Sequence, residues 1–180
     1  MSTREAILRA ALHVIGERGV AGLTNRRIVA EAGVSLGSLT YHFPSQTELL
    51  REAMLLFVED ETERLGALAR QAEAPTLEDA AATVERVLEA MPMSIDEIAS
   101  LELYLQAGRD PALRDATQRC FAAYDELAAT ILRTLGVADP ERLAGPVVAL
   151  IAGLQLRRLA TGSAPRTPAG DALLLLVGER

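Results

Sequence analysis

The 180-residue sequence contains one cysteine, no tryptophan, and only three phenylalanines and three tyrosines. A single cysteine, Cys120, excludes an internal disulfide and any metal site that needs several cysteines. We expect Cys120 to be a small buried apolar residue. Because 49% of the residues are apolar and few of them are aromatic, the core must be aliphatic. That composition favours packed helices.

The residue combinations that build common catalytic sites are also missing. The chain has two histidines, no glycine-rich phosphate loop, and no nucleophile paired with a base. The acidic residues between positions 59 and 63 are most simply a solvated helix face, because no histidine accompanies them. We therefore expect a protein that is not an enzyme and that holds neither a cofactor nor a metal.

No charged segment followed by an apolar run occurs at the N-terminus, so we expect a cytoplasmic protein. Strand-like alternation of apolar and polar residues is absent as well. Apolar residues instead recur at helical spacing along the whole chain. The predicted fold class is all-α.

What the sequence does have is an informative stretch from Thr24 to Phe43. Two short helical patterns occur in it, preceded by Thr24 and Ser35. Both are good N-caps, because the side-chain oxygen accepts a free N–H of the first helical turn. Gly33 lies between the patterns, where glycine takes the left-handed conformation without a Cβ penalty. The spacing predicts a helix-turn-helix.

The second helix of this motif, at residues 35–42, has two different sides. Leu39 and Phe43 are four residues apart and face inward. The other side carries small or hydrogen-bonding groups, which suit insertion into the major groove of DNA. A helix-turn-helix that serves only for packing has the same spacing, so the pattern alone leaves both interpretations open.

The segment EAGVSLGSLTYHFPSQTELL, residues 31–50, resembles the signature of the tetracycline-repressor-like (TetR) family of bacterial regulators. The specific resemblance covers roughly residues 3–55. It implies an N-terminal three-helix DNA-binding domain at residues 1–44 and a C-terminal helical domain for ligand binding and dimerisation at residues 45–180. It also implies a ligand-responsive regulator, most simply a repressor. Such a protein binds a pseudo-palindromic operator as a homodimer and is released by a small-molecule effector.

The motif and the resemblance together define a set of candidate DNA contacts. Asn25 and Arg26 begin the first motif helix, where free N–H groups and the helix dipole favour a phosphate. Tyr41 and His42 stand where the family contacts the DNA backbone; alternatively, their rings pack between the motif and the next helix. Gln46 stands where the family often has a phosphate-contacting lysine. The candidate set is Arg4, Thr24, Asn25, Arg26, Ser35, Leu36, Gly37, Ser38, Thr40, Tyr41, His42 and Gln46.

Within that set, base contacts are expected from Leu36, Ser38 and Thr40, with Tyr41 as a further candidate, while Gly37 lets the DNA come close. No arginine, asparagine or glutamine lies on this helix, so it lacks the groups that read guanine or adenine bidentately. We expect a rather degenerate half-site that is read partly through DNA shape.

The net charge of −7 is distributed unevenly. Residues 1–50 carry five arginines and four glutamates, a net charge of +1, so the other 130 residues carry −8. Salt screens charges beyond about 8–10 Å. An acidic remainder can therefore coexist with a DNA-contacting end, although it weakens non-specific binding.

Residues 143–154 form an uninterrupted apolar run within a helix expected at about 140–161. A helix that is apolar on every side must be buried on every side. Its 12 residues are too few for a membrane span, which needs about 20. We expect this helix and the one at about 111–135 to form a four-helix bundle with a second copy; a monomer with the helix at its centre is the alternative. The candidate interface residues are Leu127, Ile131, Val147, Val148, Leu150, Ile151, Leu154 and Leu159.

The resemblance also implies an effector site among the helices that follow the motif. Their apolar, aromatic and methionine side chains suit an adaptable, mostly apolar cavity. By spacing alone, the same side chains are simply core. The candidate ligand-binding residues are Met54, Phe57, Leu88, Met91, Met93, Leu101, Tyr104, Phe121 and Tyr124.

A helical dimeric scaffold without DNA binding is the alternative function. The motif does not encode the effector, the operator sequence or the regulated genes.

Overall fold

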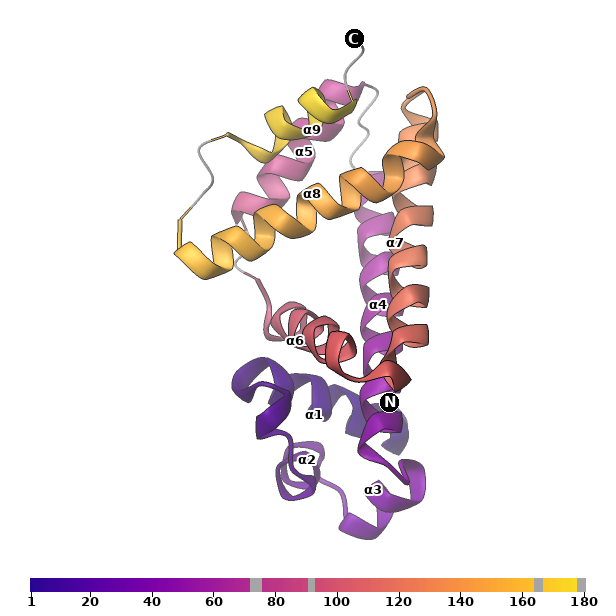
Figure 1. Ribbon diagram of the computed structural model, residues 1–180, viewed down its shortest axis with the longest axis vertical. Coiled ribbons are helices and arrows are strands. Elements are labelled where there is room, and N and C mark those ends of the chain that lie inside the picture. Colours follow the sequence, from indigo (N-terminus) through magenta and orange to yellow (C-terminus); the bar gives the residue numbers. More distant parts are fainter. Residues whose placement is uncertain (72–75, 91–92, 164–166, 178–180) are drawn as a thin grey trace. The chain divides into compact units, whose positions relative to one another are not determined.

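The computed structural model describes residues 1–71, 76–90, 93–163 and 167–177. Regular structure throughout these ranges is helical, and no residue within them forms a strand (Figure 1). The predicted all-α fold is confirmed. In chain order the elements are α1 (Thr3–Arg18), η1 (Val20–Gly22), α2 (Asn25–Ala32), α3 (Leu36–His42), α4 (Gln46–Gln71), α5 (Leu77–Ala90), α6 (Ile95–Arg109), η2 (Pro111–Leu113), α7 (Arg114–Thr134), α8 (Pro140–Thr161) and α9 (Ala169–Val177).

Several helices begin where capping residues stand in the sequence. The Ser2 hydroxyl accepts the Glu5 backbone N–H at 3.1 Å and caps α1. At the start of α6, the Ser94 hydroxyl accepts the Glu97 N–H, and the Glu97 carboxylate accepts the Ser94 N–H. These bonds satisfy donors that have no partner inside the helix, so local chemistry sets the two helix starts.

The chain forms two compact units, of which the first contains Met1–Glu61 and Ser94–Phe121. In this unit α1 packs on α6, and α1 also contacts α2 and α3. Burying one large aliphatic side chain contributes about 1.5–3 kcal/mol, so an aliphatic core can hold these short helices together. The fully buried side chains of this unit include Ile7, Leu12, Ile15, Ile28 and Leu103.

The contact between α1 and α6 depends on Gly16. A methyl group added there would overlap both the backbone carbonyl oxygen and the side chain of Ile95, the first residue of α6. Because α1 also supports α2 and α3, this glycine helps to fix α6 against the same helix that carries the motif.

The second compact unit contains Thr62–Met93 and Ala122–Arg180. In it α9 packs on α5, and a Cβ at Gly170 would lie 2.9 Å from the Ala81 carbonyl oxygen. The Glu85 carboxylate accepts the Gly170 N–H at 2.7 Å, which ties the first turn of α9 to α5. A small core joins α7, α8 and α9 through Leu132, Val147 and Leu173.

These packing units differ from the predicted domains at residues 1–44 and 45–180. By packing, α6 and the adjoining parts of α4 and α7 belong with the motif helices. The predicted division concerns function rather than packing, and it stays a prediction.

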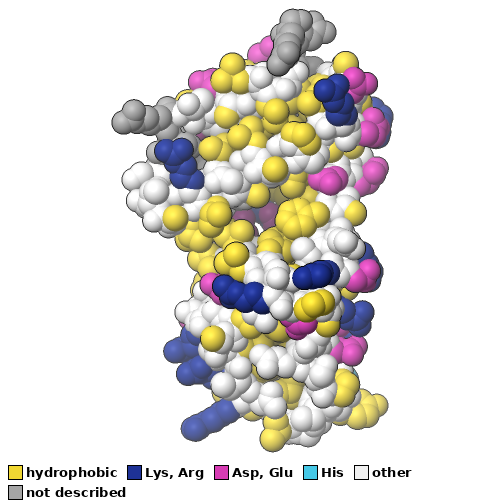
Figure 2. All heavy atoms as spheres, in the orientation of Figure 1, with side chains coloured by type: hydrophobic (Ala, Val, Ile, Leu, Met, Phe, Trp, Pro, Cys, Tyr) yellow, Lys and Arg dark blue, Asp and Glu magenta, His cyan; other side chains and the backbone are white. Residues whose placement is uncertain are grey.

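Helix α8 contains the apolar run seen in the sequence, but it is not buried on every side within one chain. In the described part of the chain, Ala144 and Val147 are its only buried residues. Leu156 and Leu159 are 52% and 43% exposed. Figure 2 shows apolar side chains distributed along this helix. The outer side of α8 is therefore an apolar surface that the chain itself leaves open.

By length and composition, α8 could also cross a membrane. An 18-residue window of the helix has a mean hydropathy of 1.3, and 11% of that window is buried. The 12-residue apolar run alone is too short for a span, but the residues that flank it in α8 extend the apolar helix to a sufficient length. One such helix is weak evidence for a membrane span, because a helix that packs against a partner chain meets the same criterion.

We expect Gly16→Ala to lower the melting temperature, because the new methyl group would push the start of α6 away from α1. Overpacking of this kind typically costs about 1–3 kcal/mol. Gly108→Ala is the matched control: Gly108 is a glycine of α6 with nothing within 4 Å of its added Cβ. That change should be neutral or stabilising by about 0.5–1 kcal/mol. Equal thermal denaturation curves for the two variants would contradict the close packing of Gly16 against Ile95.

Candidate nucleic-acid interface

Helices α2 and α3 form the predicted helix-turn-helix. The Thr24 hydroxyl accepts the Arg27 N–H at 3.4 Å, and the Ser35 hydroxyl accepts the Ser38 N–H at 3.1 Å. Gly33 ends α2 with φ of 66° and ψ of 31°, the left-handed conformation expected of a glycine at this position. Both caps and the turn lie where the sequence predicted them.

The inner side of the motif is held by three apolar side chains. Ile28 is 1% exposed, Leu39 is 2% exposed and Phe43 is 5% exposed. Val29 and Ala32, the other apolar residues of α2 near this side, are only partly buried. Leu39 and Phe43 therefore anchor α3, and its other residues are free to face away from the core.

The opposite side of α3 is open. Leu36 is 55% exposed and Tyr41 is 83% exposed, and Gly37 and Thr40 are exposed as well. The alternative in which the Tyr41 ring packs between the motif and α4 is wrong at this exposure. His42 is half-buried, and its ring meets the Tyr41 ring edge-on with centroids 5.2 Å apart.

Gly37 is not needed by the fold of the chain itself. A Cβ added at this position would approach only the Ser35 hydroxyl, at 3.8 Å, which is an ordinary contact. Its backbone is helical, so the conformational freedom of glycine is not needed either. The missing side chain instead leaves space on the exposed side of α3, which would let another molecule approach the helix backbone.

The arginines near the motif differ in what they contact. Arg4 donates to the Glu52 carboxylate at 2.8 Å, and its guanidinium lies 5.3 Å from the centre of the Phe43 ring. Arg27 donates to the Gly22 carbonyl at 2.5 Å. Arg26 is exposed and makes no ion pair with any residue in the described ranges. It is thus a cation at the start of α2 that is available to an external anion.

A small hollow of about 80 Å³ lies where the starts of α2 and α4 meet α3. Polar side chains of Asn25, Thr40, Ser45 and Gln46 line it, together with apolar groups from the inner side of the motif. The Ser45 hydroxyl accepts the Glu48 N–H at 3.1 Å and caps α4, whose first turn keeps other N–H groups without helical partners. Neutral donors at helix starts favour a bound anion such as a phosphate.

The structure therefore brings most of the predicted DNA contacts into one region of the first unit. Residues from Leu36 to His42 share α3, with Ser35 as its N-cap, and Asn25 and Gln46 line the same hollow as Thr40. One partner escaped the sequence: Glu52, which holds Arg4. Nothing in the sequence connects Arg4 with a residue 48 positions away. Ser45, whose capping-box spacing predicts the start of α4, caps that helix beside Gln46.

The predicted ligand-binding residues fall into both compact units, and Met91 lies outside the described residues. In the first unit Met54 and Phe57 are buried, and the rings of Tyr104 and Phe121 lie 5.0 Å apart between centroids. Leu101, in the same unit, is half-buried.

Three further ligand candidates belong to the second unit: Leu88, Met93 and Tyr124, all half-buried. The Leu88 backbone carbonyl accepts a hydrogen bond from the Arg158 guanidinium. Within the described ranges, none of the predicted ligand-binding residues lines the hollow beside α3 or the hollow between α5 and α9.

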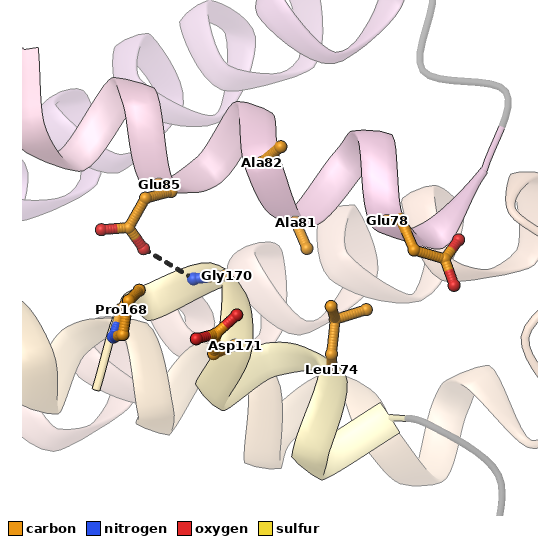
Figure 3. Close-up of a pocket in the computed structure, with 8 residues that line it drawn as sticks. All are labelled: Glu78, Ala81, Ala82, Glu85, Pro168, Gly170, Asp171 and Leu174. Atoms are coloured by element: carbon orange, nitrogen blue, oxygen red, sulfur yellow. Dashed lines mark hydrogen bonds between the residues drawn. The ribbon is translucent and has the colours of Figure 1, made fainter.

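The larger hollow, about 250 Å³, lies between α5 and α9 (Figure 3). Glu78, Glu85 and Asp171 are among its lining residues, and Figure 3 shows the Glu85 carboxylate bound to the Gly170 N–H. In the described ranges no group of three or more histidine, cysteine, aspartate or glutamate residues could hold a metal ion. The Glu85 carboxylate is already used to tie α9 to α5.

The predicted interface residues divide between the core of the chain and its surface. Val147 is 8% exposed, and Leu150 and Ile151 pack against the same small core. Leu127, Ile131, Val148 and Leu154 are half-buried, whereas Leu159 is exposed. The sequence missed the exposed leucines beside them, namely Leu156 on α8 and Leu175 and Leu176 on α9.

Cys120 is 1% exposed, with its sulfur 3.7 Å from the Met54 carbonyl oxygen. Burial raises the pKa of the Cys120 thiol to about 11, so the thiol stays protonated near neutral pH. The prediction of a small buried residue is confirmed.

Comparisons with known proteins agree along nearly the whole chain. Residues 7–53 match the family model of bacterial regulatory proteins of the tetR family, and residues 75–179 match that of the tetracyclin repressor-like C-terminal domain. The HTH-type transcriptional regulator CymR of Pseudomonas putida is 33% identical over 168 residues, which cover 88% of this chain and 80% of CymR.

Solved structures show the same similarity. A TetR-family member from Streptomyces coelicolor A3 has a TM-score of 0.72 at 30% identity, over 99% of this chain and all of that one. The multidrug binding protein EbrR, crystallised with ethidium, has a TM-score of 0.73 at 31% identity, over 98% of each chain.

Removing the cap of α3 should destabilise the motif. Ser35→Ala deletes the acceptor of the Ser38 N–H, and removal of an N-cap typically costs about 1 kcal/mol. Ser35→Asp, which keeps an acceptor, is the matched control and should retain the stability. Chemical denaturation followed by circular dichroism measures both variants; equal destabilisation of the two would show that the cap is not the cause.

Proposed function

The chain belongs to the TetR family of bacterial transcriptional regulators, and from this premise we propose that it is a ligand-responsive repressor. It binds a pseudo-palindromic DNA operator as a homodimer through α3, and a small-molecule effector releases it. Steric occlusion of a promoter is the simplest way in which such a protein represses transcription. The protein acts in the cytoplasm, where its operator lies.

The observation that carries this proposal is the open side of α3. Only the Leu39 side chain of this helix is fully committed to the core, and the exposed side includes Leu36, Gly37 and Thr40. A convex helix of small polar and apolar groups fits the major groove, where an α-helix can contact base edges. Leu36, Ser38 and Thr40 would read bases, and Gly37 would allow close approach.

Phosphate contacts in the proposed complex come mainly from neutral groups. Asn25 and Gln46 stand at the starts of α2 and α4, where free N–H groups favour an anion. Tyr41 adds a phenolic hydroxyl and His42 adds a ring N–H as donors. The Thr24 and Ser35 caps fix the starts of α2 and α3. Arg26 supplies a positive charge. Arg4 reaches DNA only by leaving Glu52, so we expect it to position α1 against α4 more than to bind phosphate.

The homodimer is supported by the open apolar side of α8. Leu156 and Leu159 on α8 and Leu175 on α9 are exposed in the single chain, and covering them would remove apolar surface from water. An interface of about 800 Å² per partner would be ordinary for such a dimer. Two-fold symmetry then presents two copies of α3 to half-sites about 34–36 Å apart, or a multiple of a helical turn.

An apolar or aromatic effector is supported by the residues after the motif. The first unit contains the buried side chains of Met54 and Phe57 and the neighbouring rings of Tyr104 and Phe121, residue types that suit an adaptable, mostly apolar site. The related protein EbrR binds ethidium, a flat aromatic cation, and ligands of that kind are a rational first screen. Thermal shift in the presence of such compounds should reveal binding as a rise in melting temperature.

The direct test of the proposed function is a gel shift with duplex DNA from the region that flanks the protein's own coding sequence. We expect a discrete complex that survives competition by unrelated duplex and dissociates on addition of the effector. A protein that binds no duplex more tightly than competitor DNA would overturn the proposal.

Arg26 and Tyr41 should affect operator binding in different ways. Arg26→Ala should weaken binding and reduce the salt slope by about 0.9 for each phosphate that the arginine neutralises. Tyr41→Ala should weaken binding with little change of slope, because the phenol is neutral. Arg86→Ala, on α5 of the second unit, is the charge-matched control and should change neither. Fluorescence anisotropy titrations from 50 to 200 mM salt, roughly the range over which such slopes are resolved, give both quantities.

The proposed dimer can be tested with Leu159→Glu. A charge on the open side of α8 should separate the subunits. Loss of the dimer should in turn abolish tight operator binding. Leu105→Glu is the control: Leu105 is 62% exposed on α6, in the other compact unit. Sedimentation velocity should report a monomer for the first variant and a dimer for the second. A dimeric Leu159→Glu would remove this surface from the interface.

A further inference from the structure

The side chain of Thr40 has a fixed hydrogen-bonding polarity. Its hydroxyl oxygen lies 3.1 Å from the Leu36 carbonyl oxygen and 3.2 Å from the Gly37 carbonyl oxygen. A carbonyl can only accept, so the hydroxyl proton of Thr40 is directed back into α3. Threonines inside other helices do the same, as at Thr83, Thr117 and Thr134. This is the usual arrangement of a helical threonine.

What Thr40 offers to an external molecule is therefore an acceptor and a methyl group. The residue is exposed, and Gly37, one turn earlier, adds no side chain that would cover it. Thr40 also borders the hollow shared with Asn25 and Gln46. A base edge that approaches α3 meets the Thr40 oxygen only as a hydrogen-bond acceptor, because the hydroxyl proton is already donated to a backbone carbonyl of α3.

We propose that Thr40 is a specificity-determining residue that selects a base with an exocyclic amino group, adenine or cytosine, and rejects guanine. In the major groove adenine presents the N6 amine and cytosine presents the N4 amine, both donors. Guanine presents only the acceptors N7 and O6 there, and thymine presents the acceptor O4, so neither base offers a donor to the lone pairs of Thr40. Because adenine and cytosine both satisfy a single acceptor, the position is degenerate but excludes guanine. This inference rests on the proposed function, which places α3 in the major groove.

The experiment is a binding-site selection from a library of random DNA duplexes, made in parallel with the wild-type protein, Thr40→Val and Thr40→Ser. Valine keeps the shape and a methyl group but removes the acceptor; serine keeps the acceptor and removes the methyl group. At one position of each half-site the wild-type protein should enrich adenine or cytosine. Thr40→Val should reduce that preference by about 3- to 10-fold, the strength of one hydrogen bond, while Thr40→Ser should keep it.

A single-group probe then tests the same contact on the selected duplex. Replacing the selected adenine by purine, or the selected cytosine by 2-pyrimidinone, removes only the amine. The wild-type protein should bind this duplex about 3- to 10-fold more weakly than the selected duplex. Thr40→Val should bind the two duplexes equally well. Circular dichroism of both variants shows that α3 is intact.

The outcomes separate this inference from the proposed function. The role of Thr40 would be overturned if Thr40→Val selected the wild-type sequence, or if its affinity for all duplexes fell by the same factor. Either result would leave DNA binding in place. Enrichment of guanine at the Thr40-sensitive position would overturn it as well. If the wild-type protein enriches no sequence, the proposed function fails, and the reading by Thr40 fails with it.

Discussion

The burial of Leu39 beneath a seven-residue helix is the constraint on which the proposed DNA-binding surface depends. A helix as short as α3 does not persist alone in water, because nucleation costs more than a few hydrogen bonds return. Leu39 and Phe43 fix it to the core, and Ser35 satisfies a donor of its first turn. Once these three residues hold the helix, its outer side has no structural task. Residues such as Gly37 and Thr40 can then be chosen for what they do with a partner.

Charge is used sparingly around this surface. Most of the arginines near α3 and α4 are bound to carboxylates or carbonyls of the chain, so they stabilise the arrangement of helices rather than project a positive field. The proposed complex then relies on short-range hydrogen bonds, helix starts and shape, which suits a chain whose net charge is −7. The engaged pairs are Arg4 with Glu52, Arg9 with Glu5 and Asp60, and Arg51 with Glu48 and Glu52.

The sequence was most informative where the physics is local. The Thr24 and Ser35 caps, the left-handed Gly33 and the inward Leu39 are determined by neighbours within four residues, and all were predicted correctly. Contacts between distant segments were not predictable in the same way. Nothing in the sequence shows that Gly16 must admit the Ile95 carbonyl. The grouping of α6 with the motif helices rests on such contacts, so it appears only in the structure.

The sequence of helix α8 was likewise insufficient to predict its environment. Its composition fits a membrane span, a core helix or an interface helix equally well, because all three favour apolar residues. The structure adds that Val147 is turned toward the small core of its own chain while Leu156 and Leu159 are not. A helix that is only half covered by its own chain leaves an apolar side open, and in the proposed homodimer a second copy covers it with a surface of matching character.

The proposed homodimer bears directly on DNA binding. In the proposed complex each half-site is contacted mainly by neutral groups together with Arg26, so we expect a single half-site to be bound weakly, since each cationic phosphate contact contributes to affinity through counterion release. In the proposed dimer the second α3 binds its half-site as an intramolecular event, at an effective concentration that can raise avidity by about 10²- to 10⁴-fold. Covering the apolar side of α8 in the proposed dimer would therefore compensate for the weak binding of each half-site by the sparsely charged surface around α3.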